Sequence, residues 1–111
     1  MRKISLAFAL AIIGALGLAF APKAMPSSIG REALVDIHKH MENMGRFVSM
    51  EEDTLACDEA RMADATFGVY FNEILKYTNL SEFRTANPEY DVYYLRAKFR
   101  KIVRLCARDG Y

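Results

Sequence analysis

Apolar residues recur at steps of three and four in three separate stretches, and this spacing constrains the fold more than any other feature of the chain. Such steps place the apolar side chains on one face of an α-helix. No stretch of useful length alternates apolar and polar residues in the manner of a β-strand. The sequence therefore predicts an all-α fold. The first apolar face comprises Leu34, Ile37, Met41, Met44 and Val48, the second Ala56, Ala60, Ala63, Phe67, Tyr70, Ile74 and Tyr77, and the third Val92, Leu95, Phe99, Ile102 and Cys106.

Local signals predict where the three helices begin. Ser28 precedes the first helix and can cap it through its hydroxyl group. Ser49, three residues before a glutamate, forms a capping-box pattern at the start of the second helix. Asn87 followed by Pro88 is typical of the start of a helix, and it predicts where the third begins. Residues 78–87 then form a connector between the second and third helices.

Residues 1–21 have the three parts of a secretory signal peptide. Two basic residues follow Met1, an uncharged run extends from Ile4 to Phe20, and the small-x-small pattern accepted by a signal peptidase ends at Ala21. The alternative is an uncleaved anchor, because about 17 apolar residues is the lower limit for crossing a bilayer. The pattern favours cleavage and predicts a periplasmic or secreted protein. If the signal segment were not cleaved, it would be the one part of the chain expected to contact a membrane.

Cleavage after the signal peptide would leave a flexible leader over residues 22–28 and a single helical domain over residues 29–111. A domain of this size buries a modest share of its surface and gains much from a covalent crosslink. Removal of residues 1–21 leaves 13 basic and 14 acidic residues, so the mature net charge is about −1. This balance argues against nucleic acid as a partner.

Cys57 and Cys106 are the two cysteines of the chain, and an exported protein with two cysteines is expected to form one disulfide. A bond between the start of the second helix and the end of the third requires these helices to be antiparallel. The sequence therefore predicts a small three-helix domain with a disulfide-closed antiparallel helical hairpin, and the first helix is expected to lie across that pair. Closing this loop is worth about 4 kcal/mol in the chain-entropy model.

Basic residues follow one face of the third predicted helix. An amphipathic cationic helix can bind anionic lipid, lipopolysaccharide or nucleic acid. The acidic cluster of residues 51–64 is expected to lie beside this face and to neutralise part of it, which favours a solvated surface over a binding site. The basic residues of this candidate face are Arg96, Arg100, Lys101, Arg104 and Arg108.

The two histidines are weak candidates for metal binding. His38 and His40 are two residues apart on a helix and therefore point in different directions. His40 with Met41 and Met44 has the nitrogen and thioether ligands that suit Cu(I), but methionine on an apolar helix face is typical of a core. We expect no metal and no cofactor. The sequence also lacks a nucleophile signature and a Gly-rich phosphate loop, so no enzymatic activity is predicted.

These observations predict a small exported helical protein that binds another envelope or extracellular protein without catalysis. Phe71 and Leu75 form a second apolar edge that could pack against another copy of the chain. One alternative is a periplasmic stress chaperone that loosens at acid pH, and another is a cationic binder of anionic lipid, lipopolysaccharide or nucleic acid. The outline of the chain is similar to the small acid-stress chaperones of the bacterial periplasm. This resemblance is architectural, and no functional residue is carried over from it.

Overall fold

The computed structural model describes residues 28–111 of the chain, and within this range every regular element is helical. The all-α prediction is thereby confirmed. The signal peptide predicted for residues 1–21, and the leader before Ser28, lie outside the described residues. The helices are α2 (Ile29–Ser49), α3 (Asp53–Thr78), α4 (Ser81–Ala86) and α5 (Val92–Arg108).

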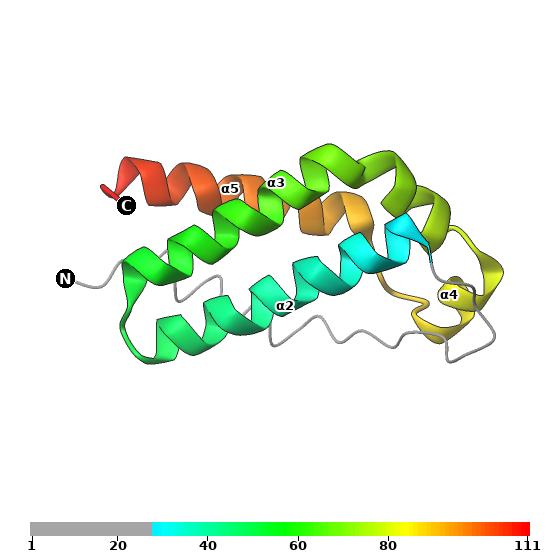
Figure 1. The fold of residues 1–111 in the computed structure, drawn as a ribbon, viewed down its shortest axis with the longest axis horizontal. Coiled ribbons are helices and arrows are strands. Elements are labelled where there is room, and N and C mark those ends of the chain that lie inside the picture. Colours follow the sequence, from blue (N-terminus) through cyan, green and yellow to red (C-terminus); the bar gives the residue numbers. More distant parts are fainter. Residues whose placement is uncertain (1–27) are drawn as a thin grey trace.

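The helix α3 is the longest and occupies the centre of the described structure (Figure 1). It packs against α2 along one side and against α5 along another. Both neighbours run in the direction opposite to α3, and α4 lies at the end where α3 finishes. The sequence predicts that the first helix lies across both of the others. In the structure α2 instead lies along α3, and its contacts with α5 are few.

The three predicted apolar faces form the core. All residues of the first and third faces are buried, and so are six of the seven residues of the second. The exception is Tyr70, whose side chain is 40% exposed. Its backbone leaves the helical region, with φ −113° and ψ 20°, so α3 bends there. The spacing predicts Tyr70 on the apolar face only if the helix is straight. The bend turns its side chain away from that face.

The start of α2 agrees with the sequence, whereas the start of α3 does not. The hydroxyl of Ser28 accepts a hydrogen bond from the backbone N–H of Arg31 at 3.0 Å, as a capping residue does. Ser49 was predicted to cap the second helix, but it ends α2. Its hydroxyl donates to the carbonyl of Arg46 at 2.8 Å and is therefore not available to α3. The second long helix begins four residues later, at Asp53.

The predicted connector contains the short helix α4. Phe83 is the buried residue of α4, and its ring makes edge-to-face contacts with Tyr77 of α3 and with Tyr90. The ring centroids lie 5.1 Å and 5.4 Å apart in these two pairs. Burial of a single phenylalanine explains why six residues become ordered as a helix here, since their sequence has no periodic apolar face to predict one.

The last helix begins later than predicted. Asn87 does not cap it, because its side-chain amide donates to the carbonyl of Phe83 at 3.1 Å and closes α4 instead. Asp91 is the residue that caps α5, and its carboxylate accepts the backbone N–H of Tyr94 at 3.0 Å. An aspartate at this position suits the positive end of the helix dipole.

The predicted disulfide is present. Cys57 and Cys106 are bonded, with their Cα atoms 6.0 Å apart. The bond joins the second turn of α3 to the end of α5. The two cysteines are 49 residues apart in the sequence. This covalent link fixes the end of α5 against the start of α3.

Two glycines have opposite environments. A Cβ atom on Gly30 of α2 would collide with the carbonyl oxygen of Glu73 of α3, so glycine is required for the close approach of these helices. A Cβ atom on Gly68 would meet no neighbour within 4 Å. The close contact between α2 and α3 is thus made at Gly30, and the bend of α3 lies two residues after Gly68, at Tyr70.

Candidate binding surface

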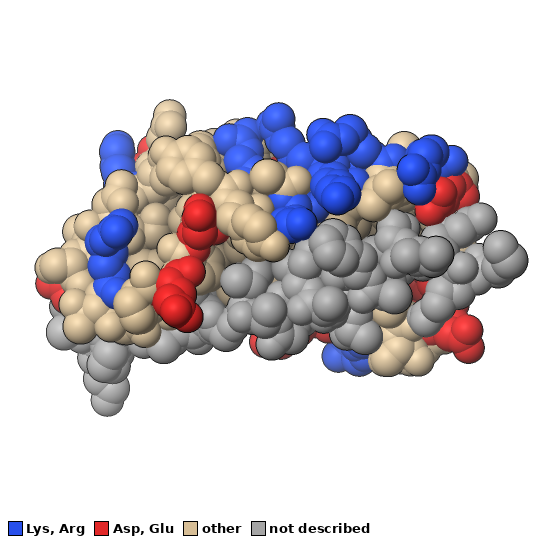
Figure 2. Space-filling view, turned by 180° about the vertical axis from the view of Figure 1, so that it is seen from behind, with Lys and Arg blue, Asp and Glu red and all other residues tan. Residues whose placement is uncertain are grey.

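The exposed side of α5 carries six cations and no acidic residue. Four of the arginines follow one another at steps of four, which places them along one side of the helix. Figure 2 shows Lys and Arg gathered in a band over α5. We call this surface the basic face. Its cations are Arg96, Lys98, Arg100, Lys101, Arg104 and Arg108.

The first turns of α5 hold one of these cations in place. The guanidinium of Arg96 lies 4.2 Å from the ring centroid of Phe71 in α3, a cation–π contact. Tyr93 packs edge-on against the same ring, with the two centroids 5.5 Å apart. The sequence offers Phe71 as part of an edge for another copy of the chain. In the structure α5 of the same chain contacts this ring, so Phe71 is partly buried.

Two tyrosines lie beside the cations at the start of α5. Tyr93 is 64% exposed and Tyr94 is 50% exposed. Lys98 lies over the ring of Tyr94, with its ammonium 5.1 Å from the ring centroid. Tyrosine and arginine are the side chains that contribute most often to the strongest contacts of protein interfaces. The basic face therefore combines charge with exposed aromatic surface.

The acidic cluster expected to neutralise the basic face is largely engaged elsewhere. Asp58 forms an ion pair with Arg61, at 2.9 Å. Glu59 contacts α2 instead of α5. Asp64 reaches the basic face, with its Oδ1 atom 4.0 Å from Nε of Arg100. Asp64 therefore neutralises part of the basic face, and Asp109 adds a second ion pair, with Arg108 at 3.4 Å.

Charge is consequently segregated between the helices. Residues 29–78, which include α2 and α3, contain ten acidic and five basic residues, a formal charge of −5 with neutral histidines. The helix α5 has a formal charge of +6. The helix α2 itself holds three acidic and three basic residues, so the net negative charge lies in residues 50–78. Most of these belong to α3, which packs against both α2 and α5.

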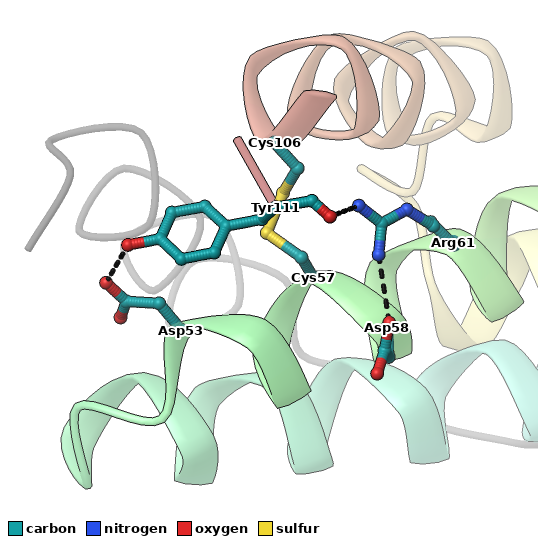
Figure 3. The surroundings of a disulfide bond; sticks show 6 residues. All are labelled: Asp53, Cys57, Asp58, Arg61, Cys106 and Tyr111. Carbon is teal, nitrogen blue, oxygen red and sulfur yellow. Dashed lines mark hydrogen bonds and ion pairs between the residues drawn. A yellow bond between two sulfur atoms is a disulfide. The ribbon is translucent and has the colours of Figure 1, made fainter. Parts of the chain in front are cut away.

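At the disulfide, the last residue of the sequence folds back onto α3 (Figure 3). The hydroxyl of Tyr111 donates to Oδ2 of Asp53 at 2.9 Å, and its backbone N–H donates to the carbonyl of Cys106 at 2.8 Å. The guanidinium of Arg61 donates to the main-chain oxygen of Tyr111. These contacts surround the disulfide bond with hydrogen bonds from both helices. We call Cys57, Cys106, Asp53, Arg61 and Tyr111 the disulfide end.

The opposite end is held by aromatic rings and one histidine. His38 of α2 has its Nε2 atom 2.8 Å from the hydroxyl of Tyr90, which in turn packs against Phe83. Burial lowers the pKa of His38 to about 4, because the protonated ring would lose hydration there. Burial also raises the pKa of Tyr90, so this phenol keeps its proton and can donate it to the neutral imidazole. We call His38, Tyr77, Phe83 and Tyr90 the aromatic end.

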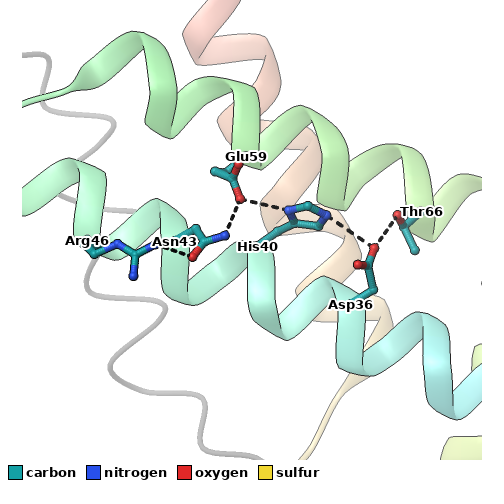
Figure 4. Close-up of polar contacts among 6 residues, drawn as sticks. All are labelled: Asp36, His40, Asn43, Arg46, Glu59 and Thr66. Carbon is teal, nitrogen blue, oxygen red and sulfur yellow. Dashed lines mark hydrogen bonds and ion pairs between the residues drawn. The ribbon is translucent and has the colours of Figure 1, made fainter.

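His40 links α2 to α3 through carboxylates (Figure 4). Its Nδ1 atom lies 2.9 Å from Oε1 of Glu59, and its Nε2 atom lies 3.3 Å from Oδ2 of Asp36. Asn43 donates to the same Glu59 oxygen at 3.0 Å, and Thr66 donates to Asp36 at 3.3 Å. The two ring nitrogens face carboxylates from α2 and α3, so this histidine serves as a polar bridge between the two helices.

The weak metal candidates do not converge. Met41 and Met44 are buried in the core, 2% and 1% exposed, whereas the ring of His40 is directed toward carboxylates. Within residues 28–111, no group of three or more His, Cys, Asp or Glu side chains has the geometry to hold a metal ion. Both methionines thus fill space between helices.

Sequence reasoning located the basic face and the disulfide but not the contacts of His38 and Tyr111. The separation of His38 and Tyr90 is 52 residues, and that of Asp53 and Tyr111 is 58 residues. No local pattern joins positions so far apart. The one available signal was that His38 lies one residue from the apolar position of Ile37, which places it at the border of the buried face.

None of the helices in residues 28–111 has the length and apolarity needed to cross a bilayer. Comparisons with protein-family models, with curated proteins and with solved structures find no match to this chain.

Proposed function

We propose that the protein is a small exported binding protein, without catalytic activity, whose basic face holds an acidic surface of another envelope or extracellular protein. One observation carries this proposal: the exposed side of α5 presents six cations and no acidic residue. Charge of one sign on one face attracts a partner of opposite charge and orients it before contact.

The environment of α5 favours a protein partner over a lipid surface. A membrane-bound amphipathic helix inserts its apolar side among the acyl chains. Here that side, which includes Leu95, Phe99 and Ile102, is buried against α3. The disulfide at Cys106 fixes the helix in this position. Exposed Tyr93 supplies the aromatic surface that protein interfaces use.

Export is supported by two independent features. The first 21 residues have the composition and order of a secretory signal peptide. The disulfide fits an extracellular or periplasmic location, where such bonds persist. An exported binding protein meets its partner outside the reducing cytosol, so the crosslink that stabilises α5 is retained while the basic face is in use.

Site-specific photocrosslinking in the cells that produce the protein tests this function. A crosslinker at Ala97, on the exposed side of α5, should capture a discrete protein, whereas one at Ala86, an exposed residue of α4, should not. The double variant R100E/R104E should lose the captured band. The matched variant R46E/R84E, which reverses two exposed cations in other helices, should keep it.

Binding to vesicles serves as the opposing test. Salt-sensitive binding of the purified protein to vesicles of anionic phospholipid, abolished by R100E/R104E, would assign the basic face to lipid and overturn the protein partner. Crosslinks that are equal at Ala97 and Ala86 would also overturn it, because they would show contact without a preferred surface.

A second candidate function, a stress chaperone that loosens at acid pH, is favoured by His38. The ring is buried as the neutral form, and its protonation at low pH disfavours the packed aromatic end. This chaperone should bind a hydrophobic dye and suppress aggregation of an unfolded client near pH 3 but not at pH 7. A near-UV circular dichroism spectrum and dye fluorescence that are unchanged from pH 7 to pH 3 would reject it.

A further inference from the structure

A groove of about 340 Å³ lies between the start of α2 and the middle of α3, away from the basic face. Its walls come from α2 residues spaced three and four apart and from α3 residues one turn apart, near the bend of α3. The floor is apolar, and two carboxylates from α2 stand at its edge. The lining residues are Ile29, Glu32, Ala33, Asp36, Thr66 and Tyr70.

Apolar surface continues from the groove along the solvent side of α3. Met62 and Val69 lie four residues before and three residues after Thr66, so both are its neighbours on the helix surface. Val69 is 73% exposed, more than any other large apolar residue of the described structure. Ile29 is exposed at the other wall. A contiguous exposed apolar surface of this kind is typical of an interaction site.

The rim of the groove is acidic. Glu32 is exposed, and Asp36 has half of its side chain exposed although it accepts a hydrogen bond from Thr66 and lies 3.3 Å from His40. Glu73 lies one turn beyond Tyr70, outside the lining of the groove, and its carboxylate is 3.8 Å from the ammonium of the exposed Lys76. The rim therefore fits a cationic partner that carries an aromatic or aliphatic side chain for the apolar floor.

The basic face of the same protein has this chemistry. It carries arginines at steps of four and, beside them, the exposed rings of Tyr93 and Tyr94. Because the basic face and the groove lie on different sides of α3, one chain cannot join its own two surfaces. In a pair of chains, the basic face of one copy can contact the groove of the other copy.

We propose that the protein self-associates head to tail, with the basic face of one copy docked on the acidic groove between α2 and α3 of a second copy. Such a contact is heterologous, because each copy contributes a different surface. It uses the face that the proposed function assigns to an acidic partner, so that partner and self-association compete.

Sedimentation of the purified, disulfide-bonded protein tests the association. The weight-average mass should rise with protein concentration at low salt and return toward the monomer near 0.5 M NaCl, roughly where surface charges are screened. The variant R100E/R104E removes the basic face, and E32K/E73K removes the acidic rim. Each should weaken self-association about tenfold or more. The control R46E/R84E should associate like the wild type.

Mixing the two interface variants is the decisive measurement. R100E/R104E keeps an intact groove, and E32K/E73K keeps an intact basic face. Each alone should sediment as a monomer, and an equimolar mixture should form a 1:1 complex that does not extend further. Unchanged far-UV circular dichroism in both variants establishes that they are folded.

Three results would overturn head-to-tail association. They are a monomer at every concentration of the wild type, interface variants that associate as strongly as the wild type, and a mixture of the two variants that stays monomeric.

The proposed function is tested by a different measurement, the crosslink from Ala97. Loss of the Ala97 crosslink to another protein would reject the acidic partner even where self-association is observed, and a retained crosslink in a strictly monomeric protein would reject self-association alone.

Discussion

The two ends of α3 contact the rest of the domain through different kinds of interaction. At its start, a covalent bond between Cys57 and Cys106 is surrounded by hydrogen bonds from Tyr111. At its finish, the aromatic end holds α2, α3, α4 and the segment before α5 through ring contacts and one histidine. We therefore expect the disulfide end to respond to reductant and the aromatic end to respond to acid, so that each end can be tested by a separate chemical condition.

Removal of the disulfide should have the largest effect. The double variant C57A/C106A should lower the free energy of unfolding by about 4 kcal/mol, because the unfolded chain regains the freedom of a 49-residue loop. Urea unfolding followed by circular dichroism measures this change. The wild type in excess dithiothreitol is the matched control and should lose the same amount. Equal midpoints for the oxidised and reduced proteins would show that the disulfide end contributes little.

Acid should act on the other end through His38. The unfolded chain takes up a proton on this residue near pH 6.5, whereas the folded chain takes it up near pH 4. The stability contributed by the neutral ring is therefore complete above about pH 6.5 and is lost as the pH falls toward 4, by up to about 3 kcal/mol.

The variant H38Q keeps a side-chain amide that can bond to Tyr90 but cannot be protonated in this range. Its free energy of unfolding should therefore fall less than that of the wild type between pH 6.5 and pH 4. Urea titrations at several pH values give both curves. Parallel curves for the two proteins would assign the acid response to the carboxylates instead and would remove the main support for an acid-loosened chaperone.

Gly30 lies in a tightly packed contact with Glu73 and Tyr77 of α3, whereas Gly68 of α3 has open space around it. G30A should lower the free energy of unfolding by about 2 kcal/mol, because the added methyl group forces α2 away from the carbonyl of Glu73. G68A should raise it by about 1 kcal/mol, because alanine favours a helix interior and meets no neighbour here. Thermal unfolding of the two variants gives the sign of each change. A stabilised G30A protein would contradict the close approach of the helices.

The smallest effect is expected from the hydrogen bonds around the disulfide. The variant Y111F removes the donor to Asp53 and should cost about 1 kcal/mol of stability. Its unfolding should be compared with that of the wild type in both oxidised and reduced forms. A cost that appears in neither form would mean that the ring of Tyr111, and not its hydroxyl, holds this end.

The sequence predicts the core well because the apolar periodicity is local and long. The faces of α2 and α5 are buried at every predicted position, and the disulfide forms as the two-cysteine count indicates. Predictions of helix starts were less successful. Ser49 and Asn87 both have the residue type of a cap, but their side chains bond to the preceding helix in the structure. A cap is decided by which neighbouring backbone group is free, and a single residue type does not reveal that.

The charged surfaces show the same division. The sequence alone determines that residues 92–108 are basic without an acidic residue and that the acidic residues lie earlier in the chain. The tertiary structure decides which acidic residues reach this face. Asp64 lies 4.0 Å from Arg100, whereas Asp58 pairs with Arg61 of its own helix.

The amino-acid sequence by itself determined the all-α class, the apolar faces and the crosslinked pair, because each follows from local spacing or from the number of cysteines. Only the tertiary structure decided that α3 stands between α2 and α5, that Phe83 orders a fourth helix and that His38 meets Tyr90. These outcomes depend on contacts between residues far apart in the chain. The physical reason is that packing selects among many long-range contacts of similar chemistry, and a local pattern carries no record of that selection.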